Sequence, residues 1–255
     1  MYGSKDVTRG LLQRVVRSFR RHGGLHVART ACRILLDATV VCWYYRVLQS
    51  RRRFAVGTHQ LSYFFHPYNH TWRNERCVEV PFVLDWIKTA APTATLEVGN
   101  VLSHYVGVDH EVLDKYEPGA GVLNLDVMDY CPPKKYDLIV TISTLEHVGW
   151  DESPRDPGKA PAAVLHLLGL LREGGNLVLT VPLGHNPYLD DFLVRGDLPF
   201  SEAFVVELER GFNCWEVARR GKLGQALVPR GKAVLLGVIT RSEAMQYRVD
   251  GPHAR

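Results

Sequence analysis

The feature that most constrains the fold is the alternation of short apolar strands with helical segments over residues 95–239. Continuous apolar runs, typical of strands buried on both faces, lie at 136–142 and 176–181. The other strand-like segments are 95–98, 111–114, 121–125, 212–217 and 233–239. Apolar residues at helical spacing mark residues 74–90 and 160–171. Strands that alternate with helices form parallel sheets with both faces covered, so we expect an α/β fold with a doubly wound, mostly parallel sheet of seven strands.

The N-terminal fifth of the chain differs chemically from the rest. Residues 1–53 carry twelve basic and two acidic side chains, a formal charge of +10, which leaves −6 for the remaining residues. Apolar residues recur at helical spacing in 7–19, and a more apolar segment follows at 25–48. We therefore expect a basic helical extension over residues 1–58, a main domain over 59–241 and a flexible tail over 242–255.

The sequence leaves three possible surfaces on which the basic extension could pack. It could pack on its own domain, on a second copy in a homodimer, or on an anionic membrane surface. The most apolar segment, 34–48, contains Asp37 and Arg46 and is too short to span a bilayer. Arginines interrupt the first residues, which argues against a signal peptide. Five cysteines without a CxxC pattern predict reduced thiols, so we expect a cytoplasmic protein, peripheral on the inner membrane face if the extension binds lipid.

The ligand class follows from the residues that end the strands. Ligands of open α/β sheets bind outside the carboxyl ends of the strands. A carboxylate after the second strand suits the two hydroxyls of a ribose, and Asp114 stands at that position. Neither GxGxxG nor GxxxxGK[ST] occurs, so the usual cradle for a pyrophosphate is missing. We expect a nucleoside-like ligand without phosphates.

Five segments carry a family resemblance. They are TLEVGN (95–100), VLDKYE (112–117), VLNLDVMDY (122–130), YDLIVTISTLEHVGW (136–150) and LLREGGNLVLTVP (170–182). In this order they resemble the successive motifs of class I S-adenosylmethionine-dependent methyltransferases, which implies a Rossmann-like fold and S-adenosylmethionine as the cofactor. The stretch YFFHPYNHTWRNER, together with LEVGNVLSHY, also resembles uncharacterised methyltransferases associated with surface-glycan synthesis.

The resemblance implies cofactor contacts at the strand ends. These are Glu97, Gly99, Asn100 and Ser103 at the methionine end, Asp114 at the ribose, Asp126 and Val127 at the adenine, and Ser143 near the sulfonium. Only Gly99 remains of the family's glycine repeat, and the polar side chains of Asn100 and Ser103 could serve in place of the others.

The fourth strand end favours an oxygen or carbon acceptor. Methyltransferases that act on amino groups of bases place N/D-P-P-Y/F there, whereas this chain has Ser143-Thr144-Leu145-Glu146. We expect O-methylation of a sugar, a glycan or a glycosylated small molecule. Because a sugar hydroxyl is weakly acidic, a base near neutrality or a metal is needed. His147 is the favoured catalytic base and His185 the second candidate, and Glu146 with His147 could hold Mg²⁺.

The acceptor contacts are expected in the segment 63–76, which is dense in aromatic, His, Arg and Asn side chains. His70, Trp72 and Arg73 are the predicted substrate-binding residues, since sugars stack on aromatic rings and need polar partners. Residues 185–200 lie where acceptor-binding insertions fall in this family. The alternative is a non-catalytic binding module docked to a membrane or a partner enzyme. Nucleic acid is not an expected partner, because the main part of the chain is acidic.

Overall fold

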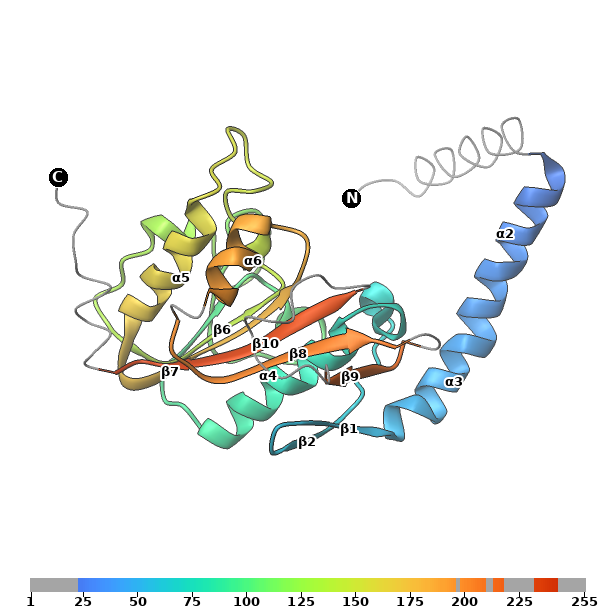
Figure 1. The fold of residues 1–255 in the computed structure, drawn as a ribbon, viewed down its shortest axis with the longest axis horizontal. Coiled ribbons are helices and arrows are strands. Elements are labelled where there is room, and N and C mark those ends of the chain that lie inside the picture. Colours follow the sequence, from blue (N-terminus) through green and yellow to red (C-terminus); the bar gives the residue numbers. More distant parts are fainter. Residues whose placement is uncertain (1–22, 196–197, 210–212, 218–231, 243–255) are drawn as a thin grey trace. The chain divides into compact units, whose positions relative to one another are not determined.

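The computed structural model describes residues 23–195, 198–209, 213–217 and 232–242. The chain divides into two compact units, Met1–Arg51 and Arg52–Arg255 (Figure 1). The predicted C-terminal tail, 242–255, lies almost wholly outside the described residues.

The described part of the first unit is helical. Its elements are α2 (Gly24–Leu36), a π-helical turn (Asp37–Val41), α3 (Cys42–Val47) and a 3₁₀ turn (Gln49–Arg51). None of the helices in the described ranges has both the length and the apolar character needed to cross a membrane. The predicted first helix, in residues 7–19, lies outside the described residues.

The second unit is built on an eight-stranded sheet in the order β5-β4-β3-β6-β7-β10-β8-β9. Its strands are β3 (Thr95–Val98), β4 (Glu111–Leu113), β5 (Val122–Leu123), β6 (Tyr136–Ile142), β7 (Leu171–Pro182), β8 (Phe200–Leu208), β9 (Trp215–Val217) and β10 (Ala233–Thr240). The strands β3 to β7 are parallel, and β10 runs antiparallel between β7 and β8. This is the predicted α/β fold, a Rossmann-like doubly wound and mostly parallel sheet.

The order of the strands reverses between β3 and β6. From β3 the chain adds β4 and then β5 on one side, and it returns to add β6 and β7 on the other. The connections that leave the two central strands therefore diverge at their carboxyl ends. In open α/β sheets this switch point is where ligands bind.

Helices cover both faces of the sheet, as Figure 1 shows. Because side chains alternate along a strand, β6 sends Leu138, Val140 and Ile142 to one face and Ile139 to the other. The first face packs on α4 (Arg76–Ala90), and the second packs on α5 (Lys159–Leu170) and α6 (Pro187–Val194). All seven residues of β6 are buried, as the apolar run in the sequence predicts.

A hairpin belongs to the second unit and precedes its sheet. It consists of β1 (Arg53–Val56) and β2 (His59–Ser62). Phe54, Val56 and Leu61 are buried in the same core cluster as α4. The boundary between the units therefore lies at residues 51 and 52, before the hairpin, whereas the sequence placed it after residue 58.

The sheet has one strand more than predicted, because β8 was not recognised. Its sequence, FSEAFVVEL, mixes polar and apolar residues, and only Val205 and Val206 are buried. The insertion predicted at 185–200 instead forms α6 and leads into β8. Asn186 caps α6 by accepting hydrogen bonds from the backbone N–H groups of Tyr188 and Leu189, and Pro187 occupies the first turn.

Candidate active site

A cavity of about 370 Å³ opens at the carboxyl edge of β3, β4 and β6. It lies at the switch point of the sheet, where the strand order predicts a ligand. Its walls come from residues 98–101, 113–117, 125–127, 143–144, 147–148 and 152. Among the predicted residues, Gly99, Asn100, Asp114, Asp126, Val127, Ser143 and His147 line the cavity.

The ionisable lining of the cavity is mostly acidic. Four carboxylates face it, from Asp114, Glu117, Asp126 and Glu152, together with the single ammonium group of Lys115. A site of this charge repels phosphate groups and attracts a ligand that carries positive charge.

The loop after β3 brings backbone close to the cavity through Gly99. Its φ of +89° is a left-handed conformation that glycine adopts without strain. A Cβ atom at this position would overlap the side chain of Thr144, which follows β6. The backbone N–H of Gly99 donates to the carbonyl of Leu113 at 2.8 Å, so the loop is fixed to β4.

Two residues predicted at the methionine end lie behind this loop. Glu97 is fully buried and does not line the cavity. Its Oε1 accepts hydrogen bonds from the backbone N–H groups of Val101 and Leu102, at 2.9 and 2.7 Å, and its Oε2 lies 2.9 Å from His110 Nε2. Ser103 is exposed outside the cavity lining, and its hydroxyl donates to Asn100 Oδ1. The geometry therefore gives Glu97 and Ser103 supporting positions instead of the predicted direct contacts.

Asp114 joins the two loops that frame the cavity. Its Oδ2 accepts from the backbone N–H of Asn100 at 2.9 Å, and its Oδ1 accepts from the N–H groups of Tyr116 and Glu117 at 2.8 Å. Oδ1 already accepts two hydrogen bonds, whereas Oδ2 accepts one and can still receive a hydroxyl donor from a ligand. Asp114, the residue predicted to contact a ribose, therefore lies in the cavity wall, and three backbone N–H groups fix the orientation of its carboxylate.

Asp126 belongs to a group of two acids and two lysines, which the sequence did not reveal. Its Oδ2 accepts from Lys159 Nζ at 2.5 Å and from Lys115 Nζ at 2.8 Å. Both ammonium groups also contact Glu152 Oε2, at 3.0 Å from Lys115 Nζ and 2.7 Å from Lys159 Nζ. Burial alone would raise the pKa of Asp126, but the hydrogen bonds from the two lysines outweigh it and lower the pKa to about 2. Asp126 is therefore ionised and held in the cavity wall by the two lysines.

Ser143 is placed by a buried network behind the cavity. It ends β6 with a φ of +41°, an unusual conformation for a residue with a side chain. Its hydroxyl donates to Glu79 Oε1 at 2.5 Å, and the same oxygen accepts from Thr180 at 2.9 Å. Arg76 Nη1 lies 2.7 Å from Glu79 Oε2, so the buried carboxylate is paired. The Ser143 hydroxyl is thus directed to α4, while the residue itself remains in the cavity wall.

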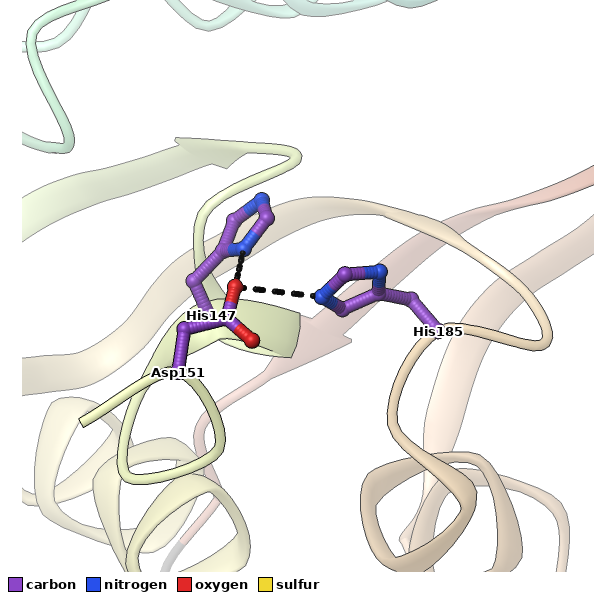
Figure 2. A group of neighbouring side chains, drawn as sticks. All are labelled: His147, Asp151 and His185. Atoms are coloured by element: carbon purple, nitrogen blue, oxygen red, sulfur yellow. Dashed lines mark hydrogen bonds and ion pairs between the residues drawn. The ribbon is translucent and has the colours of Figure 1, made fainter. Parts of the chain in front are cut away.

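The two histidines proposed for catalysis lie side by side (Figure 2). Their ring centroids are 4.6 Å apart, although His147 follows β6 and His185 follows β7. Asp151 joins them: its Oδ2 lies 2.5 Å from His147 Nδ1 and 3.2 Å from His185 Nε2. The hydrogen bond from His147 lowers the pKa of this carboxyl group. We call these three residues the histidine cluster, and only His147 among them also lines the cavity.

The predicted pairing of Glu146 with His147 does not form a metal site with the cluster. Glu146 is 2% exposed, and burial raises its pKa well above the usual range. Its Oε1 lies 3.7 Å from His147 Nε2, on the side of the ring that faces away from Asp151. Two imidazoles and one carboxylate are moreover poor ligands for Mg²⁺, which prefers oxygen atoms. Within the described residues, the group whose ligand atoms could share a metal ion is His147, Asp151 and His185.

The predicted substrate-binding residues lie outside the cavity lining. Trp72 is 5% exposed and stacks on Phe65 with ring centroids 5.3 Å apart, so its face is not available to a sugar. His70 and Arg73 are exposed. The exposed ring of this segment belongs to Tyr68, which stacks on His104 at 4.4 Å. The burial of Trp72 therefore argues against its predicted stacking on a sugar, and Tyr68 is the exposed ring of the segment.

Comparisons with known proteins concern the fold. The chain matches no protein-family model, and its sequence matches no curated protein. Among solved structures it is similar to the N-methyltransferase NodS from Bradyrhizobium japonicum WM9, with 14% identity, a TM-score of 0.43, and coverage of 66% of this chain and 97% of that one. It is also similar to the 1,6-didemethyltoxoflavin-N1-methyltransferase from Burkholderia thailandensis, with 12% identity, a TM-score of 0.40, and coverage of 75% and 100%. Because these TM-scores are low, the fold is assigned from the strand order of the sheet. The activities of the two N-methyltransferases are not transferred to this chain.

Proposed function

We propose that this protein is an S-adenosylmethionine-dependent methyltransferase that acts on a hydroxyl group of a sugar, a glycan or a glycosylated small molecule. The observation that carries the proposal is the acidic cavity at the switch point of the sheet, lined by Gly99 and by the carboxylate of Asp114. S-Adenosylmethionine carries a sulfonium cation, an ammonium group and one carboxylate, a net charge of +1, and it has no phosphate. Its net positive charge suits a cavity whose four carboxylates outnumber the two lysines, Lys115 and Lys159, that pair with Asp126 and Glu152.

The cavity offers each part of the cofactor a suitable wall. We assign the ribose to Asp114, whose carboxylate is held by three backbone N–H groups. The adenine is assigned to Val127 and the fixed carboxylate of Asp126. The methionine part is assigned to Gly99 and Asn100, since the absent side chain at residue 99 allows close approach to backbone.

The acceptor and the proton it loses are assigned to the part of the cavity wall formed by His147. Methyl transfer to a hydroxyl forms an O–C bond, breaks the C–S bond of the sulfonium and releases a proton. His147 and His185 are the groups proposed to serve the removal of this proton, because their cluster begins at the cavity wall. His147 can act as a base through Nε2, since its Nδ1 faces Asp151, or the cluster can act through a metal ion.

Support for a sugar acceptor comes from the exposed aromatic and polar side chains of residues 63–76. Tyr68 presents an exposed ring beside His104, and rings of this kind pack on the apolar face of a sugar. His70 and Arg73 are exposed on the same segment and can supply polar partners. The residues after β6 also lack the N/D-P-P-Y/F motif of methyltransferases that act on amino groups of bases.

Titration of the full chain with S-adenosylhomocysteine tests the proposal. We expect micromolar affinity by calorimetry and a loss of about tenfold or more in the Asp114→Asn variant, because the carboxylate loses an acceptor oxygen and its charge. Asp129→Asn is the matched control, since Asp129 is an exposed acid that does not line the cavity. Millimolar or absent affinity in the wild-type protein would favour the alternative, a non-catalytic module with this fold.

The acceptor class needs a separate measurement. Transfer of labelled methyl groups would be followed with p-nitrophenyl glycosides and, in parallel, with primary amines of similar size. We expect transfer to the glycosides. Transfer to the amines alone would retain the methyltransferase and refute the O-directed assignment.

We further propose that the first unit attaches the protein to an anionic membrane surface. Leu25, Cys32 and Leu36 are exposed at helical spacing on α2, and Leu25 and Leu36 keep 68% and 52% of their surface exposed. Arg29 and Arg33 lie on the same helix, within a segment of formal charge +10. Apolar side chains flanked by arginines bind at the boundary between lipid headgroups and acyl chains.

Sedimentation with vesicles separates the partners of this helix. We expect the full chain to bind vesicles that contain phosphatidylserine and not vesicles of phosphatidylcholine alone, and Leu36→Asp to abolish the binding. Thr30→Asp adds the same charge at an exposed polar position of α2 and should weaken binding only slightly. Absence of vesicle binding, with a dimer in light scattering that Leu36→Asp dissociates, would refute the membrane and support a second copy as the partner.

A further inference from the structure

We infer that His147, Asp151 and His185 form a binding site for a divalent transition-metal ion, such as Zn²⁺, and that this ion lowers the pKa of the acceptor's hydroxyl group. The metal site stands on the geometry of the cluster alone. Its role in the reaction rests on the proposed methyl transfer. Of the two modes of proton removal, His147 acting as a base or a metal ion held by the cluster, we thus favour the metal ion.

The three ligand atoms are close enough to share one ion. His147 Nδ1, Asp151 Oδ2 and His185 Nε2 all lie within 4.8 Å of one another. In a tetrahedral site, metal–ligand bonds of about 2.0–2.2 Å place neighbouring ligand atoms roughly 3.3–3.6 Å apart. The separations of 2.5 and 3.2 Å from Asp151 Oδ2 are both shorter, so the side chains would rotate apart to admit an ion.

Backbone contacts fix the positions from which the ligands extend. The N–H of Asp151 donates to the carbonyl of His147 at 3.1 Å, which closes a turn between these two ligands. Asn186 follows His185, is fully buried, and donates from Nδ2 to the carbonyl of Glu146 at 3.2 Å. The loops after β6 and β7 are therefore tied together next to the cluster. A site whose ligands are held before the ion arrives loses less conformational entropy on binding.

The ligand set favours zinc-like ions over Mg²⁺. Imidazole suits Zn²⁺, Co²⁺, Ni²⁺ and Fe²⁺, whereas Mg²⁺ prefers oxygen ligands. The second ring nitrogen of His147 lies 3.7 Å from Glu146 Oε1, beyond hydrogen-bond distance, so Glu146 does not orient the imidazole through a hydrogen bond.

The site leaves coordination positions open toward solvent and the cavity. The side chains of His147, Asp151 and His185 are 52%, 46% and 41% exposed. Three protein ligands with an open position are typical of catalytic metal sites. An acceptor hydroxyl in that position would lose its proton to solvent, and its oxygen would form the new bond to the methyl carbon as the C–S bond breaks. The sulfonium becomes a neutral thioether, so atoms and charges balance.

Metal titration of the full chain, stripped with a chelator and dialysed, tests the site without any acceptor. Co²⁺ absorption and Zn²⁺ calorimetry should detect a binding event that weakens about tenfold or more in His185→Ala and in Asp151→Asn. Both positions are exposed, so the variants should fold. His104→Ala is the matched control, because it removes an imidazole that pairs with a carboxylate, Glu117, away from the cluster. Equal affinities in all four proteins, or no binding, would overturn the site.

The role of the ion is decided with the best glycoside acceptor from the methyl-transfer assay. We expect the stripped protein to lose turnover and to regain it when Zn²⁺ or Co²⁺ is added, while its affinity for S-adenosylhomocysteine stays unchanged. Full turnover without metal would overturn the metal role and leave His147 as a base. If no methyl transfer to any acceptor occurs, the proposed function fails, while the titration still decides the metal site.

Discussion

The side chain of Thr144 lies against Gly99, and its hydroxyl occupies the place where a side chain on residue 99 would begin. The two residues follow β3 and β6, the strands between which the order of the sheet reverses. Their contact thus lies at the switch point, and both residues line the cavity.

Substitution of Gly99 by alanine should be costly for two separable reasons. The residue would adopt a φ of +89°, and its Cβ would overlap Thr144. We expect the free energy of unfolding to fall by about 2–4 kcal/mol, measured by urea denaturation, and the affinity for S-adenosylhomocysteine to fall with it.

Two variants separate backbone strain from overlap in this prediction. Gly174→Ala is the control for strain, because Gly174 has a φ of +75° and nothing lies within 4 Å of an added Cβ. Thr144→Ala in the Gly99→Ala background should restore part of the stability, because it removes Oγ1 and Cγ2, the two closest of the three overlapping atoms. An equal loss in Gly99→Ala and Gly174→Ala would mean that the contact with Thr144 does not matter.

Removal of Glu79 should destabilise the protein far more than removal of an exposed ion-pair partner. Glu79 is fully buried and pairs with Arg76, whose side chain is 15% exposed, so Glu79→Ala leaves a largely buried guanidinium without its carboxylate. We expect a loss of about 3 kcal/mol in the free energy of unfolding. Asp191→Ala breaks the exposed pair with Arg195 and should cost less than about 1 kcal/mol. Similar losses in the two variants would show that the buried pair contributes no more than a surface pair.

The sequence predicted the sheet and the edge that carries the site, because both depend on local patterns. The buried run of β6 and the polar residues that end β3, β4 and β5 can be read within a few residues. Asp114 lines the cavity where the pattern placed it. Asn100 also lines it, although the glycine that usually follows is missing.

The missed residues are those whose roles depend on contacts between distant segments. Asp151 lies in a loop without a pattern of its own, and its importance comes from His185, which follows the next strand. Lys159 begins α5 and reaches Asp126 across 33 residues of sequence. Trp72 was misjudged because an aromatic-rich segment does not reveal which rings face the core, and Phe65 covers this one.

Acid should destabilise the protein partly through Asp126. Its pKa in the folded protein is about 2, below the ordinary value of 3.8, because the hydrogen bonds from Lys115 and Lys159 outweigh the effect of burial. A lowered pKa contributes stability that is present above the unfolded value and is lost as the pH falls from about 4 to about 2. Denaturation from pH 6 to pH 2.5 should therefore show a smaller acid-induced loss in Asp126→Asn, by up to about 2 kcal/mol. Parallel pH profiles of the wild-type protein and the variant would contradict the assignment.

Substitution of His147 should separate catalysis from cofactor binding. His147 begins the histidine cluster at the cavity wall, while Asp114 and Asp126 lie on the other strand ends. We expect His147→Gln to lower kcat by about 10²-fold or more, whether the imidazole acts as a base or holds a metal ion. The affinity for S-adenosylhomocysteine, measured by calorimetry, should change less than about threefold. His166→Gln is the matched control and should retain activity, because its imidazole contacts the backbone carbonyl of Tyr130 and lies neither in the cluster nor in the cavity lining. Full turnover in His147→Gln would remove His147 from the reaction, and a large loss of cofactor affinity would instead assign it to the cofactor site.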